Sequence, residues 1–165
     1  MRTALATLVM LILLPSRPAL AQLPPDFSGT WVEDEGARKT TFPVGNAGAQ
    51  VMTLPPADTV VTQTAATLTT ERKVMSQVIR YAYRLDGRES VNRNGANTLT
   101  TKSAWEGRKL VTQGTSFSVT SAGESLWMVK ESRWLDPSGA MLVETSYTDE
   151  AGKTDSTTLV FKKKK

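Results

Sequence analysis

The sequence predicts an all-β fold, an antiparallel up-and-down meander of about 8 to 10 strands. From Thr59 onward the chain is rich in Thr, Val, Tyr and Trp, residues that favour strands. Turn signals interrupt this region at short intervals, and each contains a glycine, which supplies the backbone conformation that tight turns need. These signals are Asp86-Gly87, Asn94-Gly95, Glu106-Gly107, Ala122-Gly123, Pro137-Ser138-Gly139 and Ala151-Gly152.

The candidate strands lie between these signals, with one more near the start of the chain. The stretch 77–85 also fits a helical stripe, but its β-branched and aromatic content and the hairpin signal that follows it favour a strand. Residues 73–76 fit either structure. The candidate strands are 30–34, 59–63, 66–72, 77–85, 97–105, 108–113, 116–121, 125–134, 140–148 and 156–163.

Alternation along the strands predicts which side chains point inward, because successive strand residues face opposite sides of a sheet. The inward rows mix aliphatic, aromatic and hydroxyl side chains. A sandwich core is usually more uniformly aliphatic, so this mixture favours a barrel with a small cavity. The rows are Ile79, Tyr81, Tyr83 and Leu85, then Leu99, Thr101, Ser103 and Trp105, then Met141, Val143, Thr145 and Tyr147, and finally Leu159 and Phe161.

The N-terminus has the pattern of a signal peptide over residues 1–21. A basic Arg2 precedes an apolar run, and Ala19-Leu20-Ala21 matches a cleavage site. We therefore expect export to a periplasm or the medium, with no stable membrane insertion after cleavage. The remaining chain is predicted to be a single domain over residues 22–161, followed by a basic tail of four lysines at 162–165 that is solvated and frayed. A monomer is expected.

Residues 34–57 form a long glycine- and proline-punctuated segment without clear periodicity. A connection of this length in a compact domain is usually functional or disordered. If the rest of the chain is a barrel, apolar residues between Phe42 and Leu54 could form a lid over its mouth. The alternative is a mobile surface loop, and the sequence does not separate the two.

Composition excludes several classes of function. The chain has no histidine and no cysteine, so it lacks the commonest general base, the thiolate nucleophile and the usual transition-metal ligands. The acidic cluster Glu33, Asp34 and Glu35 is interpreted as a solvated strand end, since neighbouring strand residues face opposite sides. No cofactor, metal or catalytic residue is predicted. The formal charge of +4 owes much to the leader and tail, so no nucleic-acid binding is inferred.

Three motifs, DFSGTW at 26–31, YRLDGRES at 83–90 and AWEGRKLV at 104–111, resemble segments of the secreted bacterial lipocalin-like proteins. Many members of that group have no characterised function. The resemblance implies a lipocalin-like, calycin-type barrel in which Gly29 permits close backbone approach and Trp31 plugs one end. Lipocalins also place an arginine near the last strand against this tryptophan, whereas here the last strand offers Lys162 and its lysine neighbours.

The function expected from this fold is binding of a small apolar or amphipathic ligand, for carriage or sequestration. Such sites are apolar with a few polar anchors and enclose several hundred Å³. An alternative is a non-catalytic periplasmic or envelope interaction module with a filled barrel or sandwich. An enzyme using carboxylates or tyrosines is the third reading. The predicted ligand contacts are Tyr81, Tyr83, Thr101, Ser103, Trp105, Thr145 and Tyr147.

Overall fold

A computed structural model describes residues 23–40, 58–74, 76–121 and 123–165. The predicted signal peptide and the 41–57 part of the expected long loop lie outside the described residues. The first part of that loop has regular structure, a short 3₁₀ helix η1 (Glu35–Ala37) and a short strand β2 (Lys39–Thr40). Within the described ranges, no helix has the length and hydropathy needed to cross a membrane.

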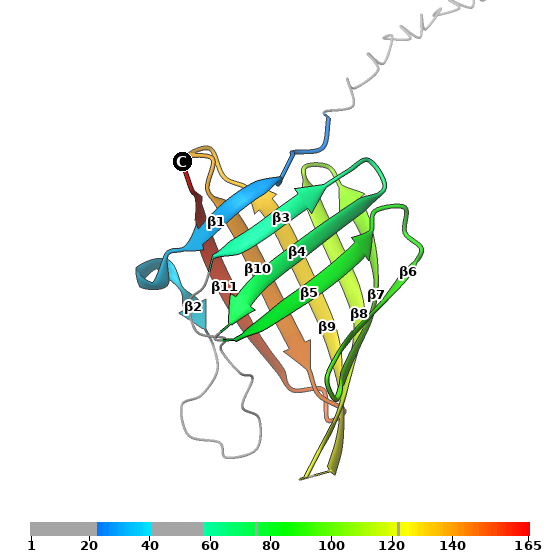
Figure 1. The fold of residues 1–165 in the computed structure, drawn as a ribbon. Coiled ribbons are helices and arrows are strands. Elements are labelled where there is room, and N and C mark those ends of the chain that lie inside the picture. Colours follow the sequence, from blue (N-terminus) through cyan, green and yellow to red (C-terminus); the bar gives the residue numbers. More distant parts are fainter. Residues whose placement is uncertain (1–22, 41–57, 75, 122) are drawn as a thin grey trace, which may run out of the picture.

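Ten antiparallel strands run up and down in a nearly closed barrel, which confirms the predicted fold class (Figure 1). The short strand β2 lies off this path and pairs with β11. The ten strands are β1 (Gly29–Glu33), β3 (Thr59–Gln63), β4 (Thr67–Val74), β5 (Gln77–Arg84), β6 (Glu89–Asn94), β7 (Asn97–Glu106), β8 (Lys109–Thr120), β9 (Gly123–Leu135), β10 (Met141–Thr148) and β11 (Thr154–Lys163).

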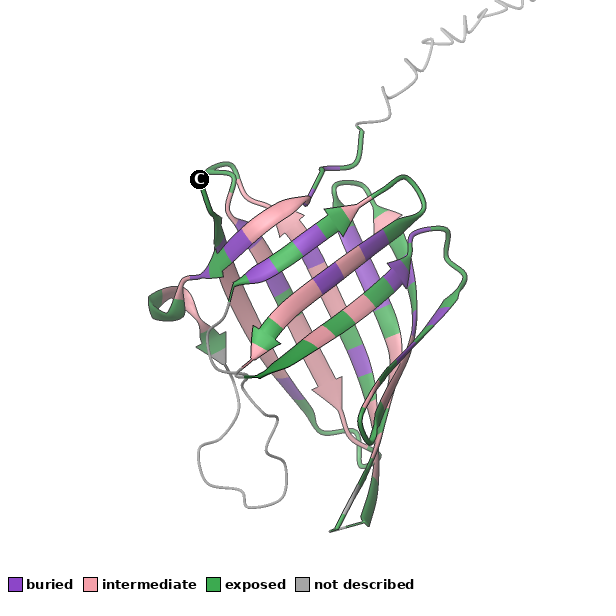
Figure 2. Cartoon of the chain, viewed as in Figure 1, coloured by how far each residue is buried: buried purple, intermediate pink, exposed green. Residues whose placement is uncertain are grey.

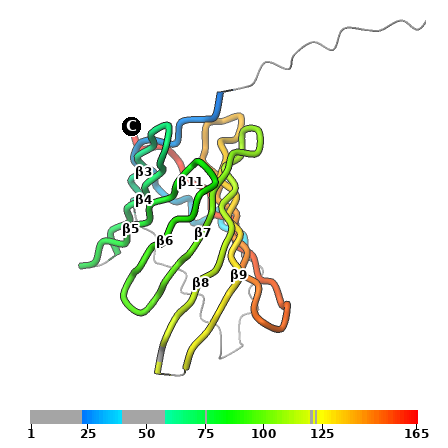
Figure 3. Tube along the Cα trace, turned by 90° about the vertical axis from the view of Figure 1, so that its right-hand side faces the viewer, coloured from blue at the N-terminus to red at the C-terminus, as the bar shows by residue number. Residues whose placement is uncertain are grey.

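The strand order shows how the barrel wall closes. It runs β5-β4-β3-β1-β11-β10-β9-β8-β7-β6, so the first and last long strands of the chain are hydrogen-bonded neighbours. Strands β3, β4 and β5 form one wall and β8 and β9 lie in the opposite one, as the side view shows (Figure 3). The two ends of the path, β5 and β6, meet at a seam that backbone pairing does not close.

Side chains close this seam in place of a backbone ladder. The backbone N–H of Ala82 donates to Oδ1 of Asn92 at 2.8 Å, and Nδ2 of Asn92 donates to the Ala82 carbonyl at 3.0 Å. Two residues further along β5, the N–H of Arg84 donates to Oγ of Ser90 at 2.8 Å. Because an unpaired strand edge is costly when covered, these three bonds stabilise the closed barrel.

The interior carries the predicted alternation, with buried and half-buried residues recurring at every second strand position (Figure 2). The apolar core gathers at the end where β1 begins, which we call the Trp31 end. The opposite end, where the β8–β9 and β10–β11 turns lie, we call the hairpin end. The buried core residues are Phe27, Trp31, Val61, Leu68, Tyr83, Leu85, Leu110, Met141, Val143 and Phe161.

The structure corrects two strand predictions. The predicted strands 108–113 and 116–121 are one strand, β8, which continues through Gly114 at a point where β7 comes very close. A Cβ at Gly114 would stand 1.9 Å from the Thr100 carbonyl oxygen. The strand β6 was not predicted, since Val91 is its one apolar side chain and that side chain points outward.

The predicted basic tail is largely part of the barrel wall. Strand β11 continues to Lys163, with Lys162 opposite Val32 and Lys163 opposite Trp31. The next residue is also held, since the N–H of Lys164 donates to the Thr30 carbonyl at 2.8 Å. The expectation of a frayed terminus was therefore wrong for residues 162–164, because β1 supplies them with hydrogen-bond partners.

Candidate ligand site

Three of the predicted ligand contacts, all tyrosines, lie together inside the barrel. The rings of Tyr81 and Tyr83 have centroids 6.4 Å apart on β5. Burial raises the pKa of Tyr83 well above its ordinary value, and the nearby Glu131 carboxylate adds to this effect. Burial likewise raises the pKa of Tyr147 to about 12, with further contributions from Glu131 and Tyr81. The three phenols therefore share one interior region, and the raised pKa values of Tyr83 and Tyr147 keep these two protonated at neutral pH.

Sequence reasoning missed the two charged residues of this region, Glu131 and Arg133 on β9. Arg133 is 5% exposed, and its Nη2 donates to Oε1 of Glu131 at 2.8 Å. Its Nε and Nη1 are buried and have no hydrogen-bond partner within the described part of the chain. The signal was available, because alternation from Val129 places both residues on the inward face.

The hydroxyl residues of the predicted site lie on the neighbouring walls. Ser103 on β7 shares a 2.7 Å hydrogen bond with Thr112 on β8, and both are buried. The Oγ1 of Thr101 is buried and has no partner among the described residues. Thr145 is half-buried on β10, directly opposite Glu131. The interior thus has a polar side on β7 and β8 as well as the tyrosine and arginine region.

Trp105 follows Ser103 on the same face of β7 and packs against the core of the Trp31 end. Its ring stacks on Phe27 with centroids 5.8 Å apart. Phe27 in turn accepts a hydrogen bond at its carbonyl from Nε1 of Trp31, over 2.8 Å. Trp31 is 1% exposed. Trp105 therefore packs with the core of this end, and its position as a ligand contact stays a prediction.

Lys163 covers Trp31 at this end of the barrel. Its Nζ lies 5.5 Å from the Trp31 ring centroid, a cation–π distance. Gly29 makes room for this contact, since a Cβ there would stand 2.6 Å from Cε of Lys163. A lysine thus takes the place against the tryptophan where the lipocalin resemblance leads one to expect arginine. That Trp31 plugs the barrel stays a prediction.

The acidic cluster at the end of β1 is only partly solvated. The Glu33 side chain is fully buried and pairs with Arg38 and, at 3.0 Å, with Nη2 of Arg72. The interpretation as a solvated strand end was therefore wrong for Glu33, because Arg38, five residues further on, and Arg72, 39 residues away, both pair with its carboxylate. Asp34 points the other way and pairs with Lys162 at 2.7 Å, and this pair holds the pKa of Asp34 below its ordinary value.

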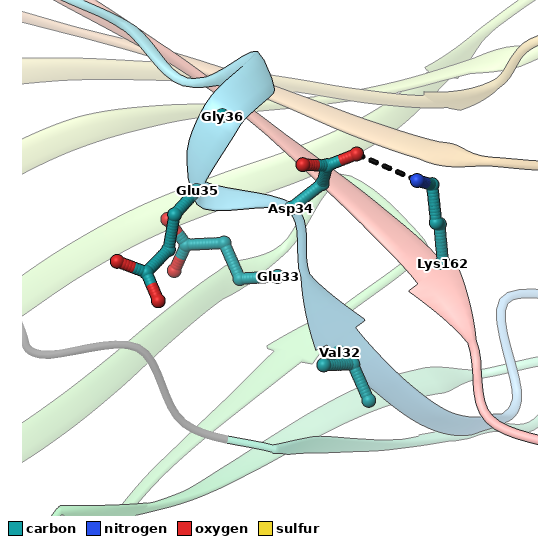
Figure 4. Close-up of a pocket in the computed structure, with 6 residues that line it drawn as sticks. All are labelled: Val32, Glu33, Asp34, Glu35, Gly36 and Lys162. Carbon is teal, nitrogen blue, oxygen red and sulfur yellow. Dashed lines mark ion pairs between the residues drawn. The ribbon is translucent and has the colours of Figure 1, made fainter.

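An open hollow of about 420 Å³ lies on the rim of the barrel, at the end of β1 (Figure 4). It is lined by Val32, Glu33, Asp34, Glu35, Gly36 and Lys162. A second open hollow lies beside the hairpin end, between the start of β9 and the β10–β11 turn. Across the described ranges, no three Asp or Glu side chains are arranged to hold a metal ion. The polar groups suited to an organic ligand are those inside the barrel, around Arg133 and the tyrosines.

No protein-family model matches the chain, and no curated protein matches it in sequence. Solved structures do match it. A REP1-NXSQ fatty acid transporter superposes with a TM-score of 0.57 at 11% identity, over 84% of this chain and 96% of its own. Apo lipid binding protein 8 of Caenorhabditis elegans gives 0.55 at 13%, over 84% and 95%. Human cRBP IV gives 0.52 at 13%, over 86% and 100%.

At these identities the likeness shows the fold. Together with the strand order, it shows that this chain has the antiparallel up-and-down barrel fold of these solved structures. The likeness covers 95% or more of each of these three structures and 84–86% of this chain.

Proposed function

We propose that this barrel binds a small amphipathic molecule whose apolar body lies in the interior and whose acidic group is held by Arg133. The observation that carries the proposal is the pair of buried Arg133 nitrogens, Nε and Nη1, without hydrogen-bond partners in the described part of the chain. Leaving buried donors unpaired costs about 1–3 kcal/mol each, and more for a charged group. An acidic ligand group would supply the missing acceptors.

The surroundings of Arg133 suit such a ligand. Glu131 accepts a single hydrogen bond, from Nη2 of Arg133, and so leaves the Nε and Nη1 donors for another acceptor. The phenols of Tyr83 and Tyr147 supply neutral donors, and their raised pKa values keep them protonated. Val129 and Val143 lie on the same inward faces and supply apolar surface. A carboxylate or phosphate joined to an apolar chain fits this combination.

The solved structures of the same fold support the class of ligand, since one is named a fatty acid transporter and another a lipid binding protein. We propose carriage or sequestration outside the cytoplasm because the signal-peptide pattern of residues 1–21 leads us to expect export to a periplasm or the medium. We propose a monomeric binding protein without catalytic activity or cofactor. No residue is assigned a catalytic role.

Paired ligands test this proposal directly. Oleate and oleyl alcohol share one apolar chain and differ in the acidic group, so calorimetric titration of both separates apolar from ionic recognition. We expect Arg133→Met to weaken oleate binding by about tenfold to a hundredfold, the range for a hydrogen bond to a charged group. Oleyl alcohol should bind the variant and the parent equally. Arg93→Met, at an exposed site on β6, is the matched control.

Two outcomes contradict the proposal. Equal loss for both ligands would show that Arg133 acts through barrel stability. If neither ligand binds and native mass spectrometry of protein isolated from an exporting host shows a bare chain, the ligand-binding function is wrong. The second candidate would then stand, a non-catalytic periplasmic interaction module with a filled barrel. It is favoured by the packed apolar core that extends from Phe27 to Leu159.

A further inference from the structure

Three buried hydroxyl side chains, those of Thr101, Ser103 and Thr112, lie on the inner face of β7 and β8. Their exposed fractions are 2%, 1% and 4%. Ser103 is the second residue after Thr101 on β7, so both point inward, and Thr112 stands directly opposite Ser103 on β8. We call these three residues the hydroxyl cluster. It offers neutral hydrogen-bonding groups on the wall next to β9, the strand that carries Arg133.

The hydroxyl of Thr101 has no hydrogen-bond partner within the described ranges. Its two cross-strand neighbours do not supply one. Gly114, directly opposite on β8, has no side chain. Ser90, directly opposite on β6, already accepts a hydrogen bond at its Oγ from the N–H of Arg84, at 2.8 Å. Burial removes the water that a free hydroxyl would bind, so this unpaired group lowers stability unless a partner arrives from outside the chain.

The other two hydroxyls of the cluster share one hydrogen bond. Oγ of Ser103 and Oγ1 of Thr112 lie 2.7 Å apart, and either of them can be the donor. Each hydroxyl carries a hydrogen, and a single bond between them uses only one of the two. The pair therefore keeps one hydrogen for a further acceptor. Together with the unpaired Thr101, the hydroxyl cluster can both donate hydrogen bonds to a ligand and accept them.

The strand register gives the spacing between Thr101 and Arg133. Arg133 stands opposite Leu110 on β8, and Leu110 stands opposite Trp105 on β7. Thr101 lies four residues before Trp105 on the same strand. With strands about 4.8 Å apart and a rise of about 3.3 Å per residue, the Cα atoms of Arg133 and Thr101 are about 16 Å apart along the wall. A fatty acid whose carboxylate is held by Arg133 therefore meets Thr101 partway along its chain, and not beside its acidic group.

We propose that the ligand is a hydroxylated fatty acid, with a hydroxyl group partway along its chain bonded to Thr101. This inference rests on the proposed function, because Arg133 has to hold the acid for the chain hydroxyl to reach Thr101. A hydroxyl both donates and accepts, as the hydroxyl cluster does, whereas a carbonyl or ether oxygen only accepts. A plain acyl chain leaves the Thr101 hydroxyl unpaired in the complex, so the site discriminates against it.

Calorimetric titration with oleate and ricinoleate tests the proposal, since ricinoleate is oleate with one added hydroxyl partway along the chain. The protein should bind ricinoleate about tenfold more tightly than oleate. Thr101→Val keeps the shape of the side chain and removes its hydroxyl, so it should abolish this preference without weakening oleate binding. Thr101→Ser keeps a hydroxyl and should retain the preference. Thr100→Val is the matched control, because the neighbouring Thr100 is half-buried on the outer face of β7.

Urea unfolding without ligand gives a second, independent test. Thr101→Val should unfold at the same urea concentration as the parent or at a higher one, because it replaces an unpaired buried hydroxyl by a methyl group. Earlier unfolding would show that the hydroxyl is paired within the protein, and would overturn the inference.

The binding outcomes separate this inference from the proposed function. If oleate binds through Arg133 and ricinoleate binds no more tightly, the hydroxylated class is wrong and the proposed function stands. If Thr101→Val keeps the preference, or Thr100→Val loses it equally, the assignment to Thr101 is overturned. If neither fatty acid binds, the proposed function and this inference both fail.

Discussion

The stability of the barrel depends on one side chain at the seam between β5 and β6, that of Asn92. Its amide replaces two backbone hydrogen bonds by pairing with both the N–H and the carbonyl of Ala82. Leucine at this position has a similar size but pairs with neither group. Both bonds are part-buried, so we use the net value of about 0.5–1.5 kcal/mol for each. Asn92→Leu should therefore lower the free energy of unfolding by about 1–3 kcal/mol.

The stability of the variant Asn92→Asp should depend on pH. A carboxylate accepts from the Ala82 N–H but meets the Ala82 carbonyl without a proton, which raises its folded-state pKa above the ordinary value. The protonated acid can make both bonds. Because the folded pKa is the higher one, the stabilisation is fully present below the unfolded value of about 3.9 and is lost as pH rises through the folded pKa. The variant should approach the parent in acid and fall below it near neutrality.

Urea unfolding followed by tryptophan fluorescence measures both effects, with the parent run at each pH. Asn97→Leu and Asn97→Asp are the matched controls, since Asn97 is exposed at the start of β7. They should change the unfolding free energy by no more than about 0.5 kcal/mol. If Asn92→Leu costs no more than Asn97→Leu, or if Asn92→Asp shows no recovery in acid, the seam is not held as described.

Two further perturbations test the barrel wall and interior. Gly114→Ala should destabilise the protein by at least about 3 kcal/mol, because its Cβ would stand 1.9 Å from the Thr100 carbonyl oxygen and the β7–β8 ladder would have to separate. Gly36→Ala meets only an ordinary 3.6 Å contact and is its control in thermal unfolding. Burial raises the pKa of Tyr147 from 10.0 to about 12. The stabilisation from its buried neutral phenol is therefore fully present below pH 10 and is lost as pH rises toward 12. The free energy of unfolding of Tyr147→Phe, measured in urea, should fall by about 3 kcal/mol less than that of the parent as pH rises from 10 to 12. An unchanged dependence of this free energy on pH would contradict the burial of the phenol.

The parts of the fold that depend on local pattern could be predicted from the sequence. The stretch 77–85 was assigned to a strand on composition and on the turn that follows, and β5 occupies residues 77–84. The turn glycines also behave as expected, with Gly95, for example, at a φ of 58° between β6 and β7. Alternation correctly placed Tyr81 and Tyr83 on the interior face, because strand geometry fixes the side to which each residue points.

What the sequence did not reveal depends on partners that are distant along the chain. Strand β6 escaped notice because its inward residues, Ser90 and Asn92, are polar, as the seam with β5 requires. Burial of Glu33 depends on Arg72, which is 39 residues away. Arg133 also depends on distant parts of the chain. Its inward direction can be read from the alternation of β9, but its burial comes from the opposite walls of the barrel.

The buried polar groups of the barrel divide into two kinds, and the difference bears on function. Asn92 and Ser103 form hydrogen bonds with other strands of the wall, and these bonds replace the ones to water that burial removes. Arg133 is paired through one nitrogen, and its Nε and Nη1 have no partner among the described residues. For stability alone such a group has little advantage, since replacing a buried ion pair by apolar side chains of similar volume is often neutral or stabilising. The unmet donors are therefore better explained by an acceptor that arrives with the ligand, and this ties the proposed acidic group to Arg133.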